Sequence, residues 1–190
     1  MNVVILTLLV LECSIAVQAC VQHDFLKAHN LVRRYEKAAN MKKMIWSDDL
    51  ADLAENWARE CIKGHSDKSL RKTKKFKKVG ENIHRSTRKK TGLAAVSSWY
   101  KEKSFYNFKK NKCSGVCGHY TQVVWATSEY VGCAVAYCPR FFKGRGGYNY
   151  VCNYGPRGNW RRKKPYIPGL QCSRCPRGYT CQKGLCAKKS

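Results

Sequence analysis

The stretch Gly118-His119-Tyr120-Thr121-Gln122-Val123-Val124-Trp125 marks a change in this chain from a pattern typical of helices to one typical of strands. From here onward, short runs rich in β-branched and aromatic residues follow one another, separated by residues that favour turns. The three runs are Tyr120–Trp125, Tyr130–Tyr137 and Tyr148–Tyr154. Runs of this length and composition predict strands, and the loops between them contain Ser128, Pro139 and the glycine-rich Gly144-Arg145-Gly146-Gly147.

The sequence before that stretch has the periodicity of helices. Apolar residues recur at three- and four-residue spacing from Leu50 to Cys61, which predicts an amphipathic helix. Ser47 is suited to cap the start of this helix and Gly64 to end it. Two more helices are expected over His23–Tyr35 and Leu93–Tyr106. Because helices come first and strands later, without regular alternation, the pattern predicts an α+β fold with an antiparallel sheet.

The composition is strongly basic. The 190 residues include 37 Lys and Arg against 12 Asp and Glu, which gives a formal net charge of +25. With 44% hydrophobic residues the chain can bury a core, and this excludes a wholly disordered protein. Such an excess of positive charge favours a polyanionic partner, which can be nucleic acid, an anionic membrane surface or an acidic polysaccharide. Composition alone does not choose among the three.

The N-terminal segment has the features of a secretory signal peptide. An apolar run from Val3 to Leu11 is followed by small residues that end at Ala19. The run is shorter than the about 20 apolar residues of a membrane-spanning helix, and it predicts cleavage after Ala19. A buried N-terminal helix is the alternative. The expected organisation is a signal peptide over 1–19, a main domain over 20–160, and a basic linker with a cysteine-rich tail over 161–190.

Twelve cysteines indicate either an oxidising compartment or bound metal. Four of them, Cys172, Cys175, Cys181 and Cys186, lie close together in the tail. Four thiolates suit tetrahedral zinc, but in a secreted protein two disulfides are the expected state. Six others can form three bridges in the main domain, with a pairing that the sequence does not select: Cys61, Cys113, Cys117, Cys133, Cys138 and Cys152. Cys13 lies within the predicted signal peptide, and Cys20 is left without an assigned partner.

Four motifs along the chain resemble those of a known family, in the same order. They are His29-Asn30-Leu31-Val32-Arg33, Gly80-Glu81-Asn82-Ile83, the stretch Gly118–Trp125 and Tyr150-Val151-Cys152-Asn153-Tyr154. With them, residues His23–Trp160 resemble the CAP superfamily, which comprises cysteine-rich secretory proteins, venom allergen-like antigen 5 proteins and pathogenesis-related 1 proteins. The tail from Pro165-Tyr166 through its four cysteines resembles the hinge of cysteine-rich secretory and glioma pathogenesis-related-like proteins.

This resemblance implies a fold, a disulfide pairing and a site. The fold is an α-β-α sandwich with a central antiparallel sheet, followed by a small disulfide-stapled C-terminal hinge. The hinge bridges implied by the resemblance are Cys172–Cys181 and Cys175–Cys186. The cleft of the family holds two histidines and two glutamates, which map by motif onto the following residues of this chain: His65, Glu81, Glu102 and His119.

Two imidazoles with open coordination positions suit Zn²⁺ or another divalent cation, and adjacent carboxylates can orient them. The expected metal ligands are therefore His65 and His119, with Glu81 and Glu102 as their partners in the cleft. Alternatively, the two glutamates only hold the cleft together by hydrogen bonds. A metal-bound water can serve as a nucleophile, but no G-x-S-x-G or comparable nucleophile motif is present in the sequence, and catalysis is not expected.

Clusters of basic residues are expected to bind the polyanion. They occupy the loop Lys68–Lys78, the segment around Arg88 and the linker before the tail. The residues are Lys68, Arg71, Lys72, Lys74, Lys75, Lys77, Lys78, Arg88, Lys89, Lys90, Arg161, Arg162, Lys163 and Lys164. A run of charges is usually just a solvated face, but this excess is too one-sided for that account. In a secreted protein, the available polyanions are glycosaminoglycans of the heparan type and anionic lipid head groups, and nucleic acid is not an expected partner.

Three classes of function thus compete. A non-enzymatic secreted binding protein with an unidentified protein receptor is expected first, and a metal-dependent hydrolase is the least favoured. A carrier of sterol or fatty acid is the third class, because parts of the family bind such lipids near the segment Phe108–Cys117. Here that loop is rich in lysine and contains two cysteines, which does not favour an apolar flap.

Overall fold

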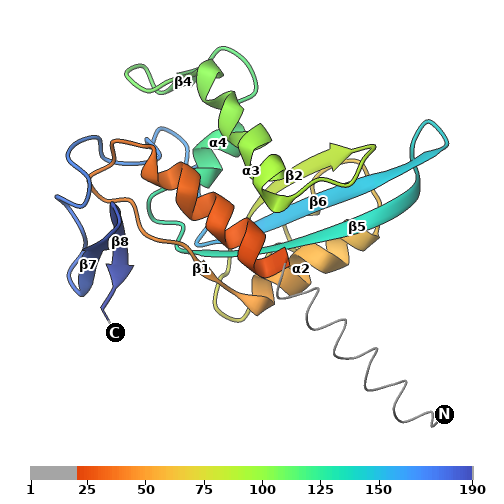
Figure 1. The fold of residues 1–190 in the computed structure, drawn as a ribbon, viewed down its shortest axis with the longest axis horizontal. Helices are drawn as coiled ribbons and strands as arrows, with labels where there is room; N and C mark the ends of the chain where they lie inside the picture. The colour runs from red at the N-terminus through yellow and green to blue at the C-terminus, as the bar shows by residue number, and fades with distance from the viewer. Residues whose placement is uncertain (1–20, 190) are drawn as a thin grey trace, which may run out of the picture.

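The computed structural model describes residues 21–189, and within this range the chain forms three layers (Figure 1). The middle layer is a four-stranded sheet. Helix α2 (Asp48–Arg59) covers one face of this sheet, while the helix of residues 21–34 and α3 (Gly92–Lys101) lie on the other face. The predicted α+β class and the α-β-α sandwich are both confirmed.

The strands follow one another in the sheet in the order β1 (Ile45–Trp46), β5 (Tyr130–Phe142), β6 (Arg145–Gly155) and β2 (Gly80–Ser86). Strands β5, β6 and β2 pair antiparallel, as expected. The edge strand β1 instead pairs parallel with β5, through two residues only. The sheet is therefore mixed at one edge and antiparallel elsewhere.

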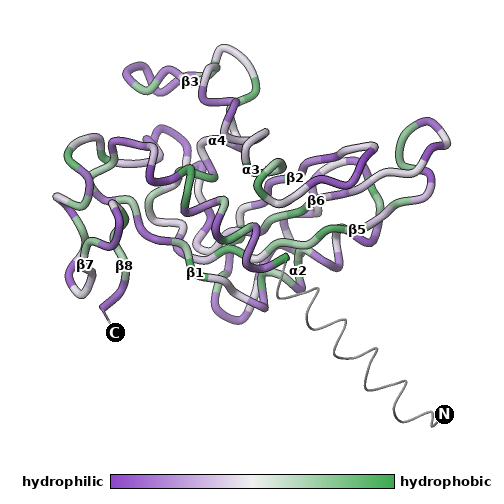
Figure 2. The backbone as a smooth tube through the Cα atoms, viewed as in Figure 1, coloured by the Kyte–Doolittle hydropathy of each residue, from purple (hydrophilic) through white to green (hydrophobic). Residues whose placement is uncertain are grey.

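Strand β6 shows how the two faces of the sheet are built. Tyr150 and Tyr154 belong to the main core cluster with residues of α3 and the N-terminal helix, whereas Val151 packs with Ala54 and Ala58 of α2. Because alternate residues of a strand point to opposite faces and both faces are covered, β6 is buried throughout its second half. Hydrophobic colouring accordingly follows the central strands, and hydrophilic colouring follows many of the outer loops (Figure 2).

Helix α2 matches the predicted helix at its start but ends earlier. Ser47 occupies the N-cap position as predicted, but its side chain makes no capping hydrogen bond; its backbone carbonyl accepts from Ala51, and two aspartates occupy the first turn. The last helical residue is Arg59, several residues before Gly64. Cys61 leaves the helix with a left-handed backbone (φ 55°) and is bonded to Cys138 of β5, which ties this end of the helix to the sheet.

The prediction of a strand over Tyr120–Trp125 is wrong, because residues Gly118–Val123 form a short helix, α4. Tyr120 and Val123 are fully buried there. Their aromatic and β-branched character suits any well-packed surface, and tertiary packing overrides the local strand preference. This matters for the site, because α4 carries His119 in its first turn.

Several element boundaries also differ from the prediction. The expected helix Leu93–Tyr106 is divided into α3 and a 3-10 helix, η1 (Glu102–Phe105). Pro139 was expected in a loop but lies within β5, where the pairing register is interrupted between Cys138 and Phe142. The sequence pattern does not predict β2. Two short paired strands, β3 (Tyr106–Asn107) and β4 (Lys112–Cys113), form a hairpin before α4.

The C-terminal tail packs against the main domain. Its strands β7 (Tyr179–Gln182) and β8 (Leu185–Lys188) form a hairpin. The bridges Cys172–Cys181 and Cys175–Cys186 hold it, in the pairing that the family resemblance implies. Leu185 belongs to the main core cluster, so the tail contributes to the core of the larger domain.

The remaining six paired cysteines form three bridges within the main domain. The pairs are Cys61–Cys138, Cys113–Cys117 and Cys133–Cys152. The predicted signal peptide, residues 1–19, and Cys20 lie outside the described residues. Within residues 21–189, no helix has both the length and the hydropathy needed to cross a membrane. The predicted domain boundary near residue 160 falls in a stretch between β6 and β7 that contains no helix or strand.

Candidate functional site

Four elements bring the predicted cleft residues together. His65 lies in the loop after α2, Glu81 on β2, Glu102 at the start of η1 and His119 on α4. The two imidazole rings are stacked, with their centroids 6.3 Å apart and their planes inclined by 29°. The resemblance to the family thus predicts a cluster that the fold assembles from residues distant in sequence.

The first pair consists of Glu81 and His65. His65 Nδ1 lies 2.8 Å from Glu81 Oε1, and the backbone N–H and the hydroxyl of Ser66 donate to the two carboxylate oxygens at 3.0 and 2.7 Å. The Glu81 side chain is fully buried, whereas 51% of the His65 side chain is exposed. Burial by itself would raise the pKa of Glu81, but the hydrogen bonds from His65 and Ser66 outweigh it and lower that pKa. The carboxylate is therefore charged and fully engaged.

The second pair consists of Glu102 and His119. His119 Nδ1 lies 2.6 Å from Glu102 Oε1, and Glu102 Oε2 accepts from the backbone N–H groups of His119 and Tyr120 at 3.0 and 3.3 Å. Glu102 therefore orients the imidazole and also satisfies two N–H groups in the first turn of α4. The Trp99 ring stacks on the His119 ring, and the two ring centroids lie 6.5 Å apart.

In both pairs the carboxylate binds Nδ1, so a neutral imidazole carries its proton there and keeps its lone pair on Nε2. Carboxylate-oriented imidazoles are the usual arrangement around metal-binding histidines, and the donor set of His65 and His119 fits Zn²⁺. Among residues 21–189, the groups of three or more close ligand atoms do not include this cleft. A bound cation would therefore take two imidazole ligands from the protein and complete its coordination with water.

The tail cysteines are not a metal site in this structure. Sulfur atoms of Cys172, Cys175 and Cys186 lie within 4.8 Å of one another. They are close because the two hinge bridges are adjacent, and each sulfur is already bonded to another cysteine. Of the two states considered for the tail cysteines, zinc ligands or disulfides, the structure has the disulfides.

His29 is not one of the four cleft residues, but it is connected to them through hydrogen bonds. Its Nδ1–H donates to the carbonyl of Phe25 (2.8 Å), and Nε2 accepts from the hydroxyl of Tyr154 (2.9 Å). Complete burial is the main reason that its pKa is lowered to about 4. Asn82 donates both to that Tyr154 hydroxyl and to the backbone carbonyl of His119. His29 therefore serves in packing and hydrogen bonding within the fold.

His84 is a neighbour of the cleft to which sequence reasoning gave no role. Its Nδ1 lies 3.0 Å from the Ser98 hydroxyl, and its ring packs on Tyr150 with centroids 5.6 Å apart. Burial, followed by the charges of Lys90 and His119, lowers the pKa of His84. Asn82 and His84 share one face of β2, but the sequence pattern does not predict that strand, so it could not place His84 beside the cleft.

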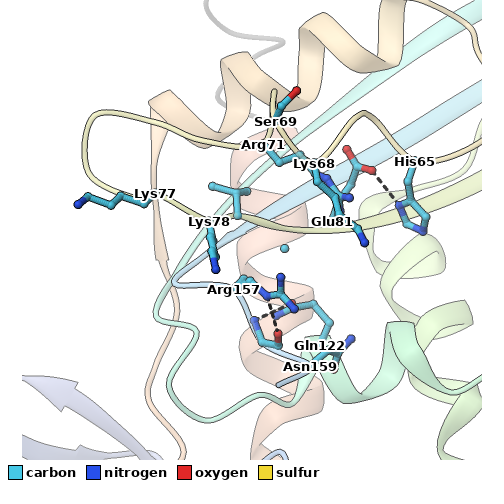
Figure 3. A pocket seen from close by; sticks show the side chains of 13 residues that line it. His65, Lys68, Ser69, Arg71, Lys77, Lys78, Glu81, Gln122, Arg157 and Asn159 are labelled. Atoms are coloured by element: carbon cyan, nitrogen blue, oxygen red, sulfur yellow. Dashed lines mark hydrogen bonds and ion pairs between the residues drawn. The ribbon is translucent and has the colours of Figure 1, made fainter. Parts of the chain in front are cut away.

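A pocket of about 570 Å³ opens beside the His65–Glu81 pair (Figure 3). Its lining includes five basic residues: Lys68, Arg71, Lys77, Lys78 and Arg157. In Figure 3, Lys68 and Arg71 lie close to Glu81, while Lys77 extends away from the others. Sequence reasoning missed Arg157, because it stands alone between Pro156 and Gly158 and only the fold brings it to the basic loop.

The other predicted polyanion-binding residues lie outside this pocket. They are Lys72, Lys74 and Lys75 of the basic loop, Arg88, Lys89 and Lys90 after β2, and Arg161, Arg162, Lys163 and Lys164 of the linker. The basic loop is exposed as predicted, but it is anchored by Phe76, which is buried in a cluster with Leu50 and Val79. The basic surface therefore consists of a pocket and separate exposed clusters.

The loop considered for lipid binding is fastened to the tail. The ring of Phe108 packs on Tyr166 with centroids 4.7 Å apart, and the Lys164 ammonium lies 4.9 Å from the Phe108 ring centre. The Cys113–Cys117 bridge closes the other end of the loop. These contacts involve the Phe108 ring, so the structure adds no support for an apolar flap that covers a lipid.

Comparisons with known proteins agree with this arrangement. A family model described as the cysteine-rich secretory protein family, CAP, matches residues 26–154. GLIPR1-like protein 1 of Homo sapiens is 46% identical over 167 residues, which cover 85% of this chain and 69% of that relative. Cysteine-rich secretory protein 2 of Cavia porcellus is 39% identical over 178 residues, which cover 90% of this chain and 70% of the relative.

A solved structure described as "Crystal structure of NaASP2 with Zn2+" has the same fold. It matches with a TM-score of 0.69 and 30% sequence identity, over 87% of this chain and 94% of that one. The region matched by the family model includes all four cleft residues, strands β1, β2 and β5, and β6 up to Tyr154. On its motifs, its fold and these relatives, the chain belongs to the cysteine-rich secretory protein (CAP) family.

Proposed function

We propose that this chain is a secreted, non-enzymatic CAP protein that binds sulfated glycosaminoglycans through its basic surface. The observation that carries this proposal is the absence of acidic partners for its bases. Within residues 21–189, the Lys and Arg side chains in ion pairs are Lys42, Arg59 and Lys103, although the sequence holds 37 such residues. The charge is thus available to an external polyanion.

The arrangement of the bases favours a long polymer over a compact ligand. Exposed clusters occur in the basic loop, after β2 and in the linker, and each can contact a separate group on one chain. Binding of this kind releases the counterions of the polymer, so the affinity falls steeply as salt increases. Anionic membranes present a similar charge but a flat surface, and they are the alternative that the experiment must separate.

The test compares heparin resin with a sulfonate cation exchanger of matched charge density. We expect elution from heparin at clearly higher salt than from the exchanger, and little binding to phosphatidylserine vesicles at physiological salt. The variant Lys72→Gln/Lys74→Gln/Lys89→Gln should lose much of the difference between the resins. The control Lys27→Gln/Lys37→Gln/Lys101→Gln removes the same charge outside the predicted clusters and should keep it. Equal elution salt on both resins for the unmodified protein would refute glycosaminoglycan binding.

A second candidate function is divalent-cation binding at His65 and His119. The observation in its favour is that both imidazoles are held through Nδ1 by carboxylates, which leaves both Nε2 atoms to coordinate. A structure of a similar protein described with Zn²⁺ supports the choice of metal. When bound, the cation would supply charge and Lewis acidity in the cleft.

Calorimetric titration with Zn²⁺ tests this site directly. We expect saturable heat for the unmodified protein and its loss in His65→Ala/His119→Ala. The control His23→Ala removes an exposed histidine outside the cleft and should titrate like the unmodified protein. Identical heats for the cleft variant and the unmodified protein would exclude the site.

A further inference from the structure

The pocket beside His65 differs from the other basic clusters in being lined by several segments that are distant in sequence. Lys68, Arg71 and Lys78 come from the basic loop, Gly80 and Glu81 from β2, and Arg157 from the segment after β6. With about 570 Å³, it has room for a saccharide unit and not only for a single ion.

The positive charge of the pocket is only partly offset from within, because one carboxylate faces five Lys and Arg side chains. Glu81 is the acidic residue in its lining, and both of its carboxylate oxygens are already bound by His65 and Ser66. No ion pair of Lys68, Arg71, Lys78 or Arg157 occurs within residues 21–189. The Nε of Arg71 is buried and has no hydrogen-bond partner in the structure. A buried donor without a partner is costly, and an acceptor atom of a ligand in the pocket would satisfy it.

The far wall of the pocket is held in place by side-chain contacts. The Arg157 guanidinium lies 4.8 Å from the ring centre of Trp160, and the Lys78 ammonium lies 5.8 Å from the same ring. Gly158 N–H donates to Gln122 Oε1, and Asn159 is bound to α4 through Gly118 and Thr121. Because an aromatic face and a fixed loop hold these cations before a ligand arrives, binding costs less ordering of side chains.

We propose that this pocket binds one sulfate group of a sulfated saccharide, with Arg71 and Arg157 supplying paired N–H donors and the lysines supplying charge. The proposal deepens the proposed function, because it assigns oriented recognition to one place on a surface that otherwise acts through charge alone. A guanidinium presents a planar fork that matches two oxygens of a sulfate or phosphate, whereas an ammonium acts as a point charge. The sulfated saccharide is preferred over a phosphate head group because the surrounding clusters suit a linear polymer.

The test uses substitutions that keep the net charge. Arg71→Lys/Arg157→Lys preserves both positive charges and removes both forks, and Arg161→Lys/Arg162→Lys is the matched control in the linker. The probe is a heparin-derived sulfated tetrasaccharide, titrated by calorimetry at physiological salt. We expect the pocket variant to bind on the order of tenfold more weakly and the control to bind like the unmodified protein. Thermal unfolding verifies the fold, and Arg157→Lys alone is the fallback if the Arg71 change destabilises the protein.

The outcomes separate this inference from the function on which it rests. Equal tetrasaccharide affinities for the pocket variant and the control would overturn the pocket while leaving the heparin-resin result intact. Failure of the unmodified protein on heparin resin would overturn both. Titrations with inorganic sulfate and with vesicles containing a phosphoinositide identify the source of the anion. Pocket-dependent binding to these vesicles without binding to the tetrasaccharide would overturn the saccharide assignment.

Discussion

At the scale of single residues, the two cleft glutamates are not equivalent. Glu81 is fully buried and shares its oxygens between a histidine and a serine, while Glu102 divides its oxygens between an imidazole and the start of α4. Glu81 therefore fixes the loop after α2, and Glu102 fixes the helix that carries His119. Both act on histidine orientation, but through different parts of the backbone.

Replacing Glu81 tests the first of these roles. The pKa of Glu81 is lowered by its hydrogen bonds, so its stabilisation is present above its unfolded pKa of 4.5 and is lost as pH falls through the lower folded value. We expect Glu81→Gln to lower the free energy of unfolding at pH 7 by about 2 kcal/mol. Urea denaturation measures it, and Glu55→Gln, in an exposed helical ion pair, should cost less than about 0.5 kcal/mol. Equal losses in both variants would contradict the role.

His29 contrasts with the charged Glu81, because burial keeps its imidazole neutral. Its pKa is lowered from 6.5 to about 4, so the unfolded chain binds more protons than the folded one between these values. Stability should therefore fall as pH falls from 6.5 to about 4, with a slope that approaches about 1.4 kcal/mol per pH unit.

His29→Gln should flatten this pH dependence, although it also lowers stability at neutral pH. Urea denaturation at a series of pH values measures the slope. His23→Gln is the matched control, since His23 is exposed in the same helix. A slope that survives in His29→Gln and disappears in the control would show that another group is responsible.

At the scale of elements, Arg33 organises the segment that follows α4. The side chain is completely buried, and its guanidinium donates only to backbone carbonyls. The acceptors are the carbonyls of Lys42, Val123, Trp125, Ala126 and Ser128. Burial lowers the pKa of Arg33 to about 9, which still leaves it charged at neutral pH. One side chain from the N-terminal helix thus shapes the turn between α4 and β5.

We expect Arg33→Lys to destabilise the fold by about 3 kcal/mol, because an ammonium cannot reach the carbonyls that the guanidinium joins and leaves them buried without donors. The free energy of unfolding from urea denaturation measures this. Arg34→Lys makes the same change at the next, exposed position and should have little effect. If the two variants were equally stable, Arg33 would not have this organising role.

The elements also show what the sequence could predict. Helix α2 has clear periodicity, because it buries one face, and strands β5 and β6 have runs of β-branched and aromatic residues, because the central strands are covered on both faces. Helix α4 and strand β2 do not, since both are short and their residues are buried by contacts with distant segments. The four cleft residues could be named from motif order, whereas Arg157 and His84 enter the site only through the tertiary fold.

At the scale of the whole molecule, the tail is joined to the main domain through a buried carboxylate. Only 2% of the Glu36 side chain is exposed, and it accepts from the hydroxyls of Tyr100 and Tyr166, each at 2.9 Å, and from Lys103. Tyr166 belongs to the segment that leads into the tail, so this cluster fastens that segment to α3 and to the turn after the N-terminal helix.

Tyr166→Phe should loosen this attachment while leaving the main domain folded. Loss of one hydrogen bond to a buried carboxylate costs about 2 kcal/mol, and we expect faster amide hydrogen exchange in the hairpin of β7 and β8. Tyr35→Phe is the control, because the Tyr35 side chain is 62% exposed. Unchanged exchange in the hairpin would mean that the disulfides and Leu185 hold the tail by themselves.

The division of the basic surface into a pocket and exposed clusters has a kinetic consequence. Exposed charges attract a polyanion over distances up to the Debye length, about 8 Å at physiological salt, before any contact forms. They should govern how often the partner arrives, whereas the oriented pocket should govern how long it stays. A matrix lined with such polymers would then slow the diffusion of the protein by repeated capture, even where each single encounter is brief.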